Sequence, residues 1–336
     1  MIGKFFNNKK ILITGGTGSF GKKFIERIHK ISKPSKVIIY SRDEFKQSNL
    51  RKEYIKKNYK GMRYFIGDVR DKNRLKEALN GVDIAIHAAA LKHIEIAEEN
   101  PQESIKTNII GTQNLIDACI EKKVKKMIAL STDKAANPIN LYGATKLAAE
   151  KLVVNSNILS SSDSTSLSVV RYGNVINSRG SVIPYFKSLV NKGIYTLPLT
   201  DKDMTRFFIT LEESIDFVIS CLTKMKGGEV FIPKMRSIKI SDIGKALSSR
   251  AKFKIIGKRS GEKTHEMLCP LETSEHTYEF KNYFMIVPSI KLPDRNFTKL
   301  IIKKEKGKKV NKNFIFSSDK NKFLTVKEIK KILNKF

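Results

Sequence analysis

The chain reads Lys10-Ile-Leu-Ile-Thr-Gly-Gly-Thr-Gly-Ser-Phe-Gly21 close to its start, and this stretch decides the fold of its first half. The apolar beginning predicts a buried strand, and the helical pattern of Phe20–His29 follows the glycines. Glycine at positions 15, 18 and 21 permits a tight turn, close approach of the backbone to a pyrophosphate, and close packing of the helix. The stretch therefore predicts a dinucleotide-binding loop at a helix N-terminus, with a plain glycine-rich turn as the alternative.

Strand and helix patterns alternate as far as residue 173. Strands are expected at Lys10–Thr14, Lys36–Tyr40, Met62–Ile66, Val82–His87, Lys126–Leu130 and Leu167–Tyr172. Helices are expected at Phe20–His29, Asp43–Asn58, Lys72–Leu79, Gln102–Glu121 and Tyr142–Asn157. The strands are continuously apolar, which is typical of parallel strands buried on both faces. The pattern predicts an α/β fold with a doubly wound parallel sheet of the Rossmann type.

The pattern changes after Gly173, where Gly, Pro and Asn separate mixed short elements. Residues 1–173 are therefore predicted to form the nucleotide-binding core, including a catalytic loop and helix. Residues 174–336 are predicted to form mainly a smaller substrate-binding lobe with a basic C-terminal segment. Some later segments are expected to return to the core.

The end of the second strand bears on the choice of cofactor. Tyr40 is followed by Ser41, Arg42, Asp43 and Glu44. An NAD site usually has a carboxylate here for the ribose 2′-hydroxyl, whereas Ser41 and Arg42 suit a 2′-phosphate. The sequence favours NADP, although the two carboxylates leave NAD open. Asp68, after the third strand, is placed to contact the adenine, and the alternative is an ordinary turn residue.

Two short motifs follow the fifth strand and indicate proton transfer. Tyr142 and Lys146 are four residues apart, so both face one side of a helix, and a nearby ammonium lowers the pKa of a phenol. Thr132, Asp133 and Lys134 stand at the carboxyl end of the strand, where doubly wound sheets bind ligands. Hydride transfer alone needs no further acid and base, so Asp133 and Lys134 indicate additional proton transfers. The alternative is a strand-end ion pair at the surface.

These motifs carry a family resemblance. The chain closely resembles inverting UDP-N-acetylglucosamine 4,6-dehydratases, which are extended short-chain dehydrogenases/reductases that open the pseudaminic acid pathway. The resemblance covers the whole chain and is clearest in Ile11–Gly21, Tyr40–Gln47, Phe65–Arg70, His87–His93, Ser131–Lys146, Arg171–Val182, Met204–Leu211 and Gly257–Glu266. The chain departs from the family at Glu95 and Ser260, where proline is frequent.

The resemblance implies roles for the reacting groups. Tyr142 takes the C4 hydroxyl proton while hydride passes from C4 to NADP, with Thr132 and Lys146 completing the set. Lys134 then removes the C5 proton, which requires a depressed pKa, and Asp133 protonates the departing C6 hydroxyl. Hydride returns to C6, and reprotonation from the opposite face inverts C5.

The resemblance also implies binding residues for NADP and UDP-N-acetylglucosamine. The cofactor set is Gly15, Thr17, Gly18, Ser19, Phe20, Gly21, Ser41, Arg42, Asp43, Lys46, Asp68, Val69, Ala88, Thr107, Tyr142 and Lys146. The substrate set is Lys92, Asn174, Arg206, Arg259 and Glu262. His87, His93 and Asn108 are expected to be structural, and homo-oligomers are usual in the family.

Composition and charge bear on which partners and which kinds of site the protein is expected to have. The 336 residues carry a formal net charge of +31, about a third of it in residues 291–336, which raises the question of polyanion binding. No basic stripe with interleaved aromatics appears, so nucleic acid is not an expected partner. No apolar run or leader predicts membrane insertion or export, and the three cysteines lack metal-ligand spacing. A cytoplasmic enzyme without a metal site is expected; the alternatives are a related UDP-sugar dehydratase or epimerase, or a non-catalytic NADP-binding basic protein.

Overall fold

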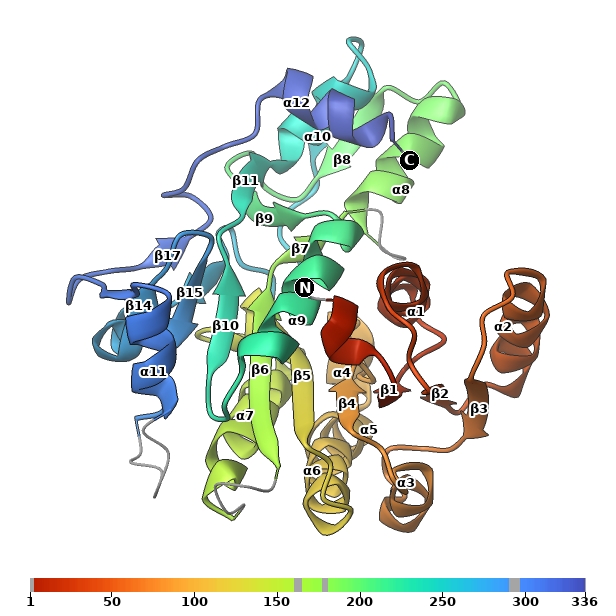
Figure 1. Cartoon of the computed structure of the whole chain (residues 1–336). Coiled ribbons are helices and arrows are strands. Elements are labelled where there is room, and N and C mark those ends of the chain that lie inside the picture. The colour runs from red at the N-terminus through yellow and green to blue at the C-terminus, as the bar shows by residue number, and fades with distance from the viewer. Residues whose placement is uncertain (1–2, 160–164, 177–180, 290–296, 336) are drawn as a thin grey trace.

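A computed structural model describes residues 3–159, 165–176, 181–289 and 297–335, so residues 177–180 of the Arg171–Val182 stretch lie outside the described part. The centre is a ten-stranded sheet in the order β16-β14-β15-β10-β6-β5-β4-β1-β2-β3 (Figure 1). Its parallel part consists of β3 (Met62–Ile66), β2 (Lys36–Ser41), β1 (Lys10–Thr14), β4 (Ile84–His87), β5 (Lys126–Thr132), β6 (Ser166–Tyr172) and β10 (Val230–Pro233).

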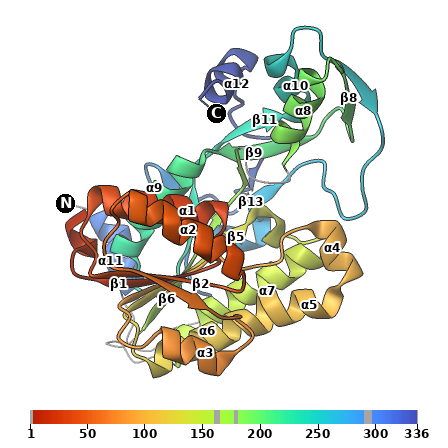
Figure 2. The same ribbon diagram turned by 90° about the vertical axis from the view of Figure 1, so that its right-hand side faces the viewer.

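Helices cover both faces of this sheet. Figure 2 shows α1 (Ser19–Ile31), α2 (Glu44–Lys56) and α9 (Leu211–Lys224) on one face. The other face carries α3 (Lys72–Ala78), α5 (Pro101–Ile105), α6 (Gly111–Glu121) and α7 (Leu141–Asn155). The strand order reverses between β1 and β4, and ligands of doubly wound sheets bind at such a reversal. The predicted fold class is confirmed.

The opening stretch shows why this order forms. Residues 11–13 of β1 are fully buried because their side chains meet helices on both faces of the sheet. Helix α1 packs against the loop without a side chain between them: a Cβ placed on Gly21 would lie 2.5 Å from Gly16 Cα. Phe24, Ile25 and Ile28 then extend the buried face of α1.

A second, smaller hydrophobic core lies in the upper part of Figure 1. It joins α8 (Val182–Asn191), α10 (Ile240–Leu247) and α12 (Val326–Leu333) to short sheets made of β7 (Asn174–Val175), β9 (Thr205–Ile209) and β11 (Arg236–Lys239), and of β8 (Thr196–Leu199) and β12 (Lys252–Ile255). Later segments return to the large sheet as β10, β14 (Thr277–Glu279), β15 (Tyr283–Ile286) and β16 (Lys308–Lys309). A domain division at residue 173 stays a prediction.

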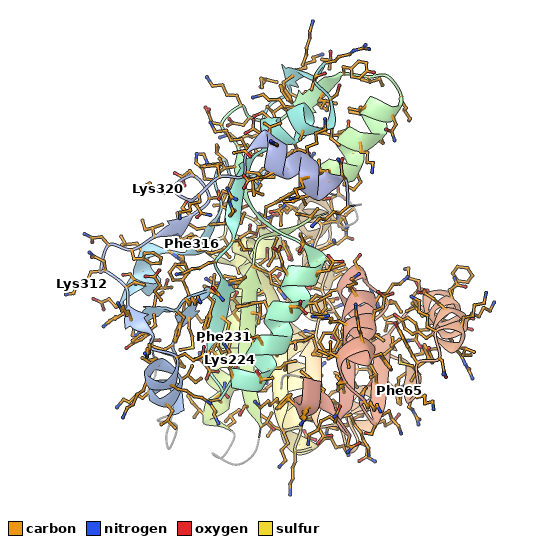
Figure 3. All side chains as sticks on the ribbon, turned by 45° about the horizontal axis from the view of Figure 1, so that its top comes forward. Phe65, Lys224, Phe231, Lys312, Phe316 and Lys320 are labelled. Atoms are coloured by element: carbon orange, nitrogen blue, oxygen red, sulfur yellow. The ribbon has the colours of Figure 1, made fainter. Side chains whose placement is uncertain are left out.

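The lysine surplus lies largely at the surface. In Figure 3, Lys312 and Lys320 point outward, whereas Phe231 and Phe316 are inside. Some of the other lysines form surface ion pairs, such as Lys72 with Asp117 at 2.9 Å. Within the described ranges, no helix has the length and apolar character needed to cross a membrane.

The helix expected at Gln102–Glu121 differs in one respect. It is divided into α5, a π-helical turn at Lys106–Ile110 and α6. The wider turn contains Thr107 and Asn108, and the Asn108 amide bonds both the Leu91 backbone and the Thr145 hydroxyl. The sequence pattern did not predict this change of pitch, because apolar spacing over one turn is nearly the same in both kinds of helix. The structural role expected for Asn108 is confirmed.

Candidate active site

A cavity of about 670 Å³ lies at the carboxyl ends of the parallel strands, at the reversal between β1 and β4. Fifteen of the sixteen predicted cofactor residues line it: Gly15, Thr17, Gly18, Ser19, Phe20, Ser41, Arg42, Asp43, Lys46, Asp68, Val69, Ala88, Thr107, Tyr142 and Lys146. The exception is Gly21, which faces the loop backbone instead. The cavity is large enough to hold much of a dinucleotide.

The glycine-rich loop shapes one wall of the cavity. Gly15 has a φ of 65°, and a Cβ there would lie 2.9 Å from the Ala88 carbonyl oxygen, so conformation and space both require glycine. Behind the loop, Thr14 Oγ1 accepts hydrogen bonds from the amides of Ala88 and Ala89 and lies 2.8 Å from His87 Nδ1. His87 is buried and also contacts Thr112, which confirms its structural role. His93, expected to be structural, lines the cavity.

The residues after β2 and β3 show whether Asp43 and Asp68 pair with neighbouring side chains or are free to contact a cofactor. Asp43 caps α2 by accepting the Lys46 amide at 2.8 Å, and its carboxylate also pairs with the Lys46 ammonium. Asp68 pairs with Arg70. Arg42 Nη1 lies 3.7 Å from Asp68 Oδ2, and more than half of the Arg42 side chain is exposed. Both carboxylates thus have cationic partners, while Arg42 presents an exposed fork at the cavity. These residues can hold a 2′-phosphorylated dinucleotide.

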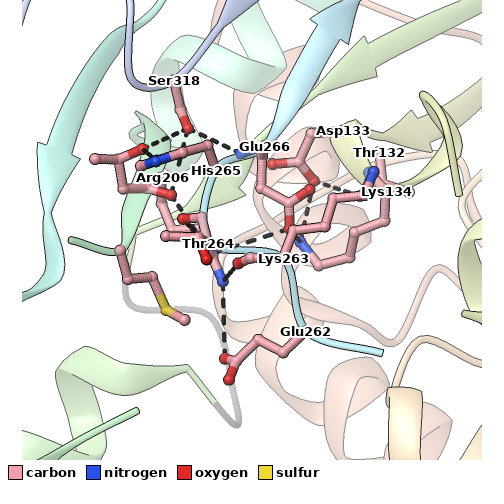
Figure 4. A network of polar contacts seen from close by, with 12 residues as sticks. Thr132, Asp133, Lys134, Arg206, Glu262, Lys263, Thr264, His265, Glu266 and Ser318 are labelled. Atoms are coloured by element: carbon pink, nitrogen blue, oxygen red, sulfur yellow. Dashed lines mark hydrogen bonds and ion pairs between the residues drawn. The ribbon is translucent and has the colours of Figure 1, made fainter. Parts of the chain in front are cut away.

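The reacting groups predicted from the sequence all line this cavity. Figure 4 shows three of them, Thr132, Asp133 and Lys134, side by side. Thr132 Oγ1 donates to Asp133 Oδ1 at 2.9 Å, and Lys134 Nζ donates to the same oxygen at 3.1 Å. The Thr132 hydroxyl also acts on Tyr142 and favours the ionised form of its hydroxyl. Asn140 accepts the Gly143 amide at 2.8 Å and so fixes the start of α7.

Two pKa predictions need correction. Burial raises the pKa of Tyr142 to about 12, and the opposing influences of Lys134 and Thr132 do not outweigh it. Burial also disfavours the charged form of Lys134, but the carboxylates of Asp133 and Glu266 outweigh it and raise the pKa of Lys134 above its ordinary value. The expected depression at Lys134 is therefore wrong. Of the two lysines in the predicted catalytic set, Lys146 has the lowered pKa, about 8, because burial outweighs the influence of Glu150.

The predicted substrate residues divide into two groups. Lys92 and Asn174 line the cavity, whereas Arg206, Arg259 and Glu262 do not. Arg206 is buried, and its guanidinium donates to the carbonyls of Thr205, Lys263 and Thr264 at 2.7, 2.9 and 3.0 Å.

The other two residues also pair with neighbours. Glu262 lies 3.7 Å from Arg206. Arg259 is exposed and lies 3.6 Å from Glu95, one of the two positions at which the chain is expected to depart from the family. Arg206, Arg259 and Glu262 thus all contact other residues of the protein in this structure.

Sequence reasoning missed Glu266. Its side chain is 3% exposed, and Oε1 lies 3.3 Å from Lys134 Nζ and 3.9 Å from Arg206 Nε. Tyr40 was missed as well, although it lines the cavity and donates to the Asp68 carbonyl at 2.8 Å. No spacing rule links Glu266 to Lys134, because the contact depends on how the C-terminal lobe returns to β5. Tyr40 could have been found, since it ends a strand at the binding edge.

Comparison with known proteins agrees with this site. Residues 11–288 match the family described as "Polysaccharide biosynthesis protein". The chain belongs to this family. It is 54% identical over 331 residues to "UDP-N-acetylglucosamine 4,6-dehydratase (inverting)" of Campylobacter jejuni subsp. jejuni serotype O:2, covering 98% of both chains. The predicted resemblance to the inverting dehydratases is confirmed.

The chain is also similar to a second curated relative and to a solved structure. "UDP-glucose 4-epimerase" of Rickettsia rickettsii is 38% identical over 335 residues, covering 98% of this chain and 96% of its own. The crystal structure of Pen from Bacillus thuringiensis superposes with a TM-score of 0.87 at 34% identity, covering 98% of each chain. The relatives of the chain thus include proteins named as a UDP-sugar dehydratase and as a UDP-sugar epimerase.

Proposed function

We propose that this protein catalyses the inverting 4,6-dehydration of UDP-N-acetylglucosamine, with epimerisation at C5, to give UDP-2-acetamido-2,6-dideoxy-β-L-arabino-hex-4-ulose. The observation that carries the proposal is the meeting of Thr132, Asp133, Lys134, Tyr142 and Lys146 in one dinucleotide-sized cavity. Identity of 54% to a relative named for this reaction supports the substrate. An enzyme that only moved hydride would not need Asp133 and Lys134 beside the tyrosine.

The cofactor we propose is NADP, which when bound would supply a hydride acceptor for C4 and a hydride donor for C6. Tyr142 takes the C4 hydroxyl proton as the hydride leaves. The Lys134 ammonium favours the ionised form of Tyr142 against burial. Lys146 stands one helical turn from Tyr142, and its Nζ donates to the Leu130 carbonyl at 2.8 Å. The exposed Arg42 fork supports recognition of a 2′-phosphate.

Elimination of water needs a base at C5 and an acid at C6. Lys134 is held protonated by two carboxylates, so it must lose a proton before it can act as the base. Asp133 Oδ1 lies 3.1 Å from Lys134 Nζ and is a direct acceptor. One transfer breaks an N–H bond of Lys134 and forms an O–H bond on Asp133. It therefore produces the amine base and the carboxylic acid together. Lys134 then takes the C5 proton, and Asp133 protonates the C6 oxygen that leaves as water.

The reaction is tested with UDP-N-acetylglucosamine in deuterated water. We expect loss of one water, deuterium at C5 and the L-arabino configuration by NMR. A D-xylo product with retained C5 geometry would identify a retaining dehydratase. A C4 epimer formed without loss of water would identify an epimerase, as the Rickettsia relatives are named. Either result refutes the proposal.

The role of Lys134 is tested by Lys134→Met, which we expect to oxidise C4 in a single turnover but not to release water. The matched control is Lys126→Met, which removes the lysine that begins β5, whereas Lys134 lies in the turn after the end of that strand. Full dehydration by Lys134→Met would show that Lys134 is not the base.

Cofactor choice is tested by measuring the affinity for NADP⁺ and NAD⁺. Arg42→Ala removes a charged donor, whose hydrogen bond is worth about 1.5–3 kcal/mol, so NADP⁺ should bind about 10- to 100-fold more weakly and NAD⁺ nearly as before. Arg51→Ala is the control, because Arg51 is exposed on α2 and does not line the cavity. Equal losses for both cofactors would contradict NADP specificity.

The family resemblance supports three further parts of the proposal: a cytoplasmic location, a homo-oligomer, and a product that opens pseudaminic acid synthesis for flagellin glycosylation. Light scattering of the purified protein measures the oligomer. Incubation of the product with the aminotransferase of that pathway tests the metabolic role.

A further inference from the structure

Glu266 reaches Lys134 from outside the cavity. Lys134 and Asp133 line the cavity, whereas Glu266 does not, and its backbone just precedes β13 (Met267–Cys269). The segment is fixed by Ser318, whose hydroxyl accepts the Glu266 amide at 2.9 Å and whose own amide donates to the Glu266 carbonyl at 2.8 Å (Figure 4). The carboxylate is therefore held at the Lys134 ammonium by the backbone on which it stands.

The proposed reaction gives Asp133 two duties that exclude each other. As the partner of the Lys134 ammonium it must be a carboxylate, whereas as the acid at C6 it must carry a proton. Between removal of the C5 proton and loss of water, Lys134 is charged and Asp133 is neutral. An ammonium with 20% exposure and no counter-ion would be costly at that stage. A second carboxylate that keeps its charge is needed there.

Glu266 is placed to keep its charge through these steps. Arg206 Nε lies 3.9 Å from the oxygen that faces Lys134, so the carboxylate is flanked by two cations. Arg206 itself is held by three backbone carbonyls and cannot move away without losing them. The second oxygen, Oε2, is buried and has no hydrogen-bond partner among the described residues. Within the described residues, the carboxylate therefore depends on its cations alone.

We propose that Glu266 is a positioning residue: it fixes Lys134 Nζ at the cavity wall and is the counter-ion of that ammonium while Asp133 carries the proton destined for C6. This inference rests on the proposed function for the roles of Lys134 and Asp133. The hold of Glu266 on Lys134 can nevertheless be measured without any substrate.

The first measurement is the pH dependence of Lys134 acetylation by acetic anhydride, followed by peptide mass spectrometry on the full-length protein. Besides Glu266, the titratable or charged groups that face Lys134 are Asp133 on its own turn, Tyr142 from α7, Arg206 from β9 and Lys263 from the segment before β13. Glu266→Gln keeps the shape and removes one negative charge. The labelling midpoint should fall by about one pH unit or more, since an opposite charge at this distance shifts a titration by one to three units.

The second measurement is catalysis. Glu266→Gln should lower kcat about tenfold or more and slow deuterium entry at C5, with KM and C4 oxidation nearly unchanged. Glu266→Asp, which restores the charge, should recover the labelling midpoint and part of kcat. Glu229→Gln is the control for loss of a buried carboxylate. Glu229 is fully buried but contacts Ser168 and the Gly227 amide, away from the site. It should leave both readouts as in wild type.

The outcomes separate the two proposals. A labelling midpoint that is unchanged in Glu266→Gln overturns the inference, whether or not the substrate is correct. A lower kcat with an unmoved midpoint overturns it too, because that is the signature of a merely structural residue. Failure of the wild-type protein to dehydrate UDP-N-acetylglucosamine, with a shifted midpoint in Glu266→Gln, refutes the proposed function and leaves the Lys134–Glu266 coupling established.

Discussion

Replacing Lys146 with methionine should stabilise the protein and abolish its activity. Lys146 is 5% exposed, and burial lowers its pKa from 10.5 to about 8. A tenfold change in proton affinity corresponds to about 1.4 kcal/mol, so keeping this ammonium folded costs about 3 kcal/mol at neutral pH. Methionine removes that cost and loses the 2.8 Å bond from Nζ to the Leu130 carbonyl, worth about 1 kcal/mol. Lys146→Met should therefore be more stable than wild type by about 2 kcal/mol at pH 7.

The difference in stability between Lys146→Met and the wild type depends on pH. An unfolded lysine stays protonated up to about pH 10.5, whereas folded Lys146 releases its proton near pH 8. The unfolded state therefore binds more protons across this window, and the stability of the wild type rises through it. The advantage of Lys146→Met should vanish between pH 8 and 10.5. Urea unfolding at pH 7 and pH 10 measures both values.

Lys126→Met is the control for Lys146→Met. The pKa of Lys126 is also lowered to about 8 by burial, but Nζ donates to two carbonyls, those of Leu222 and Met225. Its replacement should give a smaller gain in stability and leave dehydration intact, because Lys126 does not line the cavity. The reasoning fails if Lys146→Met is less stable than wild type at pH 7, or if its stability difference is the same at pH 10.

Three other substitutions test the packing and the ion pairs. Gly21→Ala would place a methyl 2.5 Å from the loop backbone, so thermal unfolding should show a loss of about 1–3 kcal/mol, and an unchanged melting temperature would contradict the packing described. Arg171→Met leaves the Glu150 carboxylate buried without its partner, so the free energy of unfolding in urea should fall by about 3–5 kcal/mol. The double variant Arg171→Met with Glu150→Met should recover most of that loss. A single variant as stable as wild type would refute the importance of the pair. Glu95→Ala frees Arg259 from an exposed ion pair, so the free energy of unfolding should change by less than about 1 kcal/mol. The KM for the sugar nucleotide should fall, because Arg259 becomes available to the substrate. A higher KM would show that Glu95 itself assists binding.

The parts of the site that could be predicted are those encoded locally. Gly15 follows a strand, Thr132 ends a strand and Tyr142 lies in the first turn of a helix, so their order along the chain also gives their place at one edge of the sheet. The doubly wound order follows from repeated strand–helix units for the same reason.

Other parts depend on contacts between distant segments. The pKa of Lys134 was predicted in the wrong direction because two carboxylates outweigh its burial. Asp133, the neighbouring residue, has the larger influence, and Glu266 comes from the C-terminal lobe, where no local sequence pattern indicates the contact. Arg206 was expected at the substrate, but its guanidinium is taken up by carbonyls of residues 205, 263 and 264. Charge balance in a buried cluster is a property of the assembled chain, so residue type and spacing do not determine it.

The return of Glu266 to Lys134 has a consequence for biosynthesis. The glycine-rich loop and the tyrosine helix belong to the first half of the chain, whereas Glu266 and the Ser318 that fixes its backbone belong to the last quarter. Synthesis therefore makes the glycine-rich loop and the tyrosine helix long before it makes the carboxylate that pairs with Lys134. Under the proposed mechanism, a chain that ends before residue 266 lacks the second counter-ion of its base.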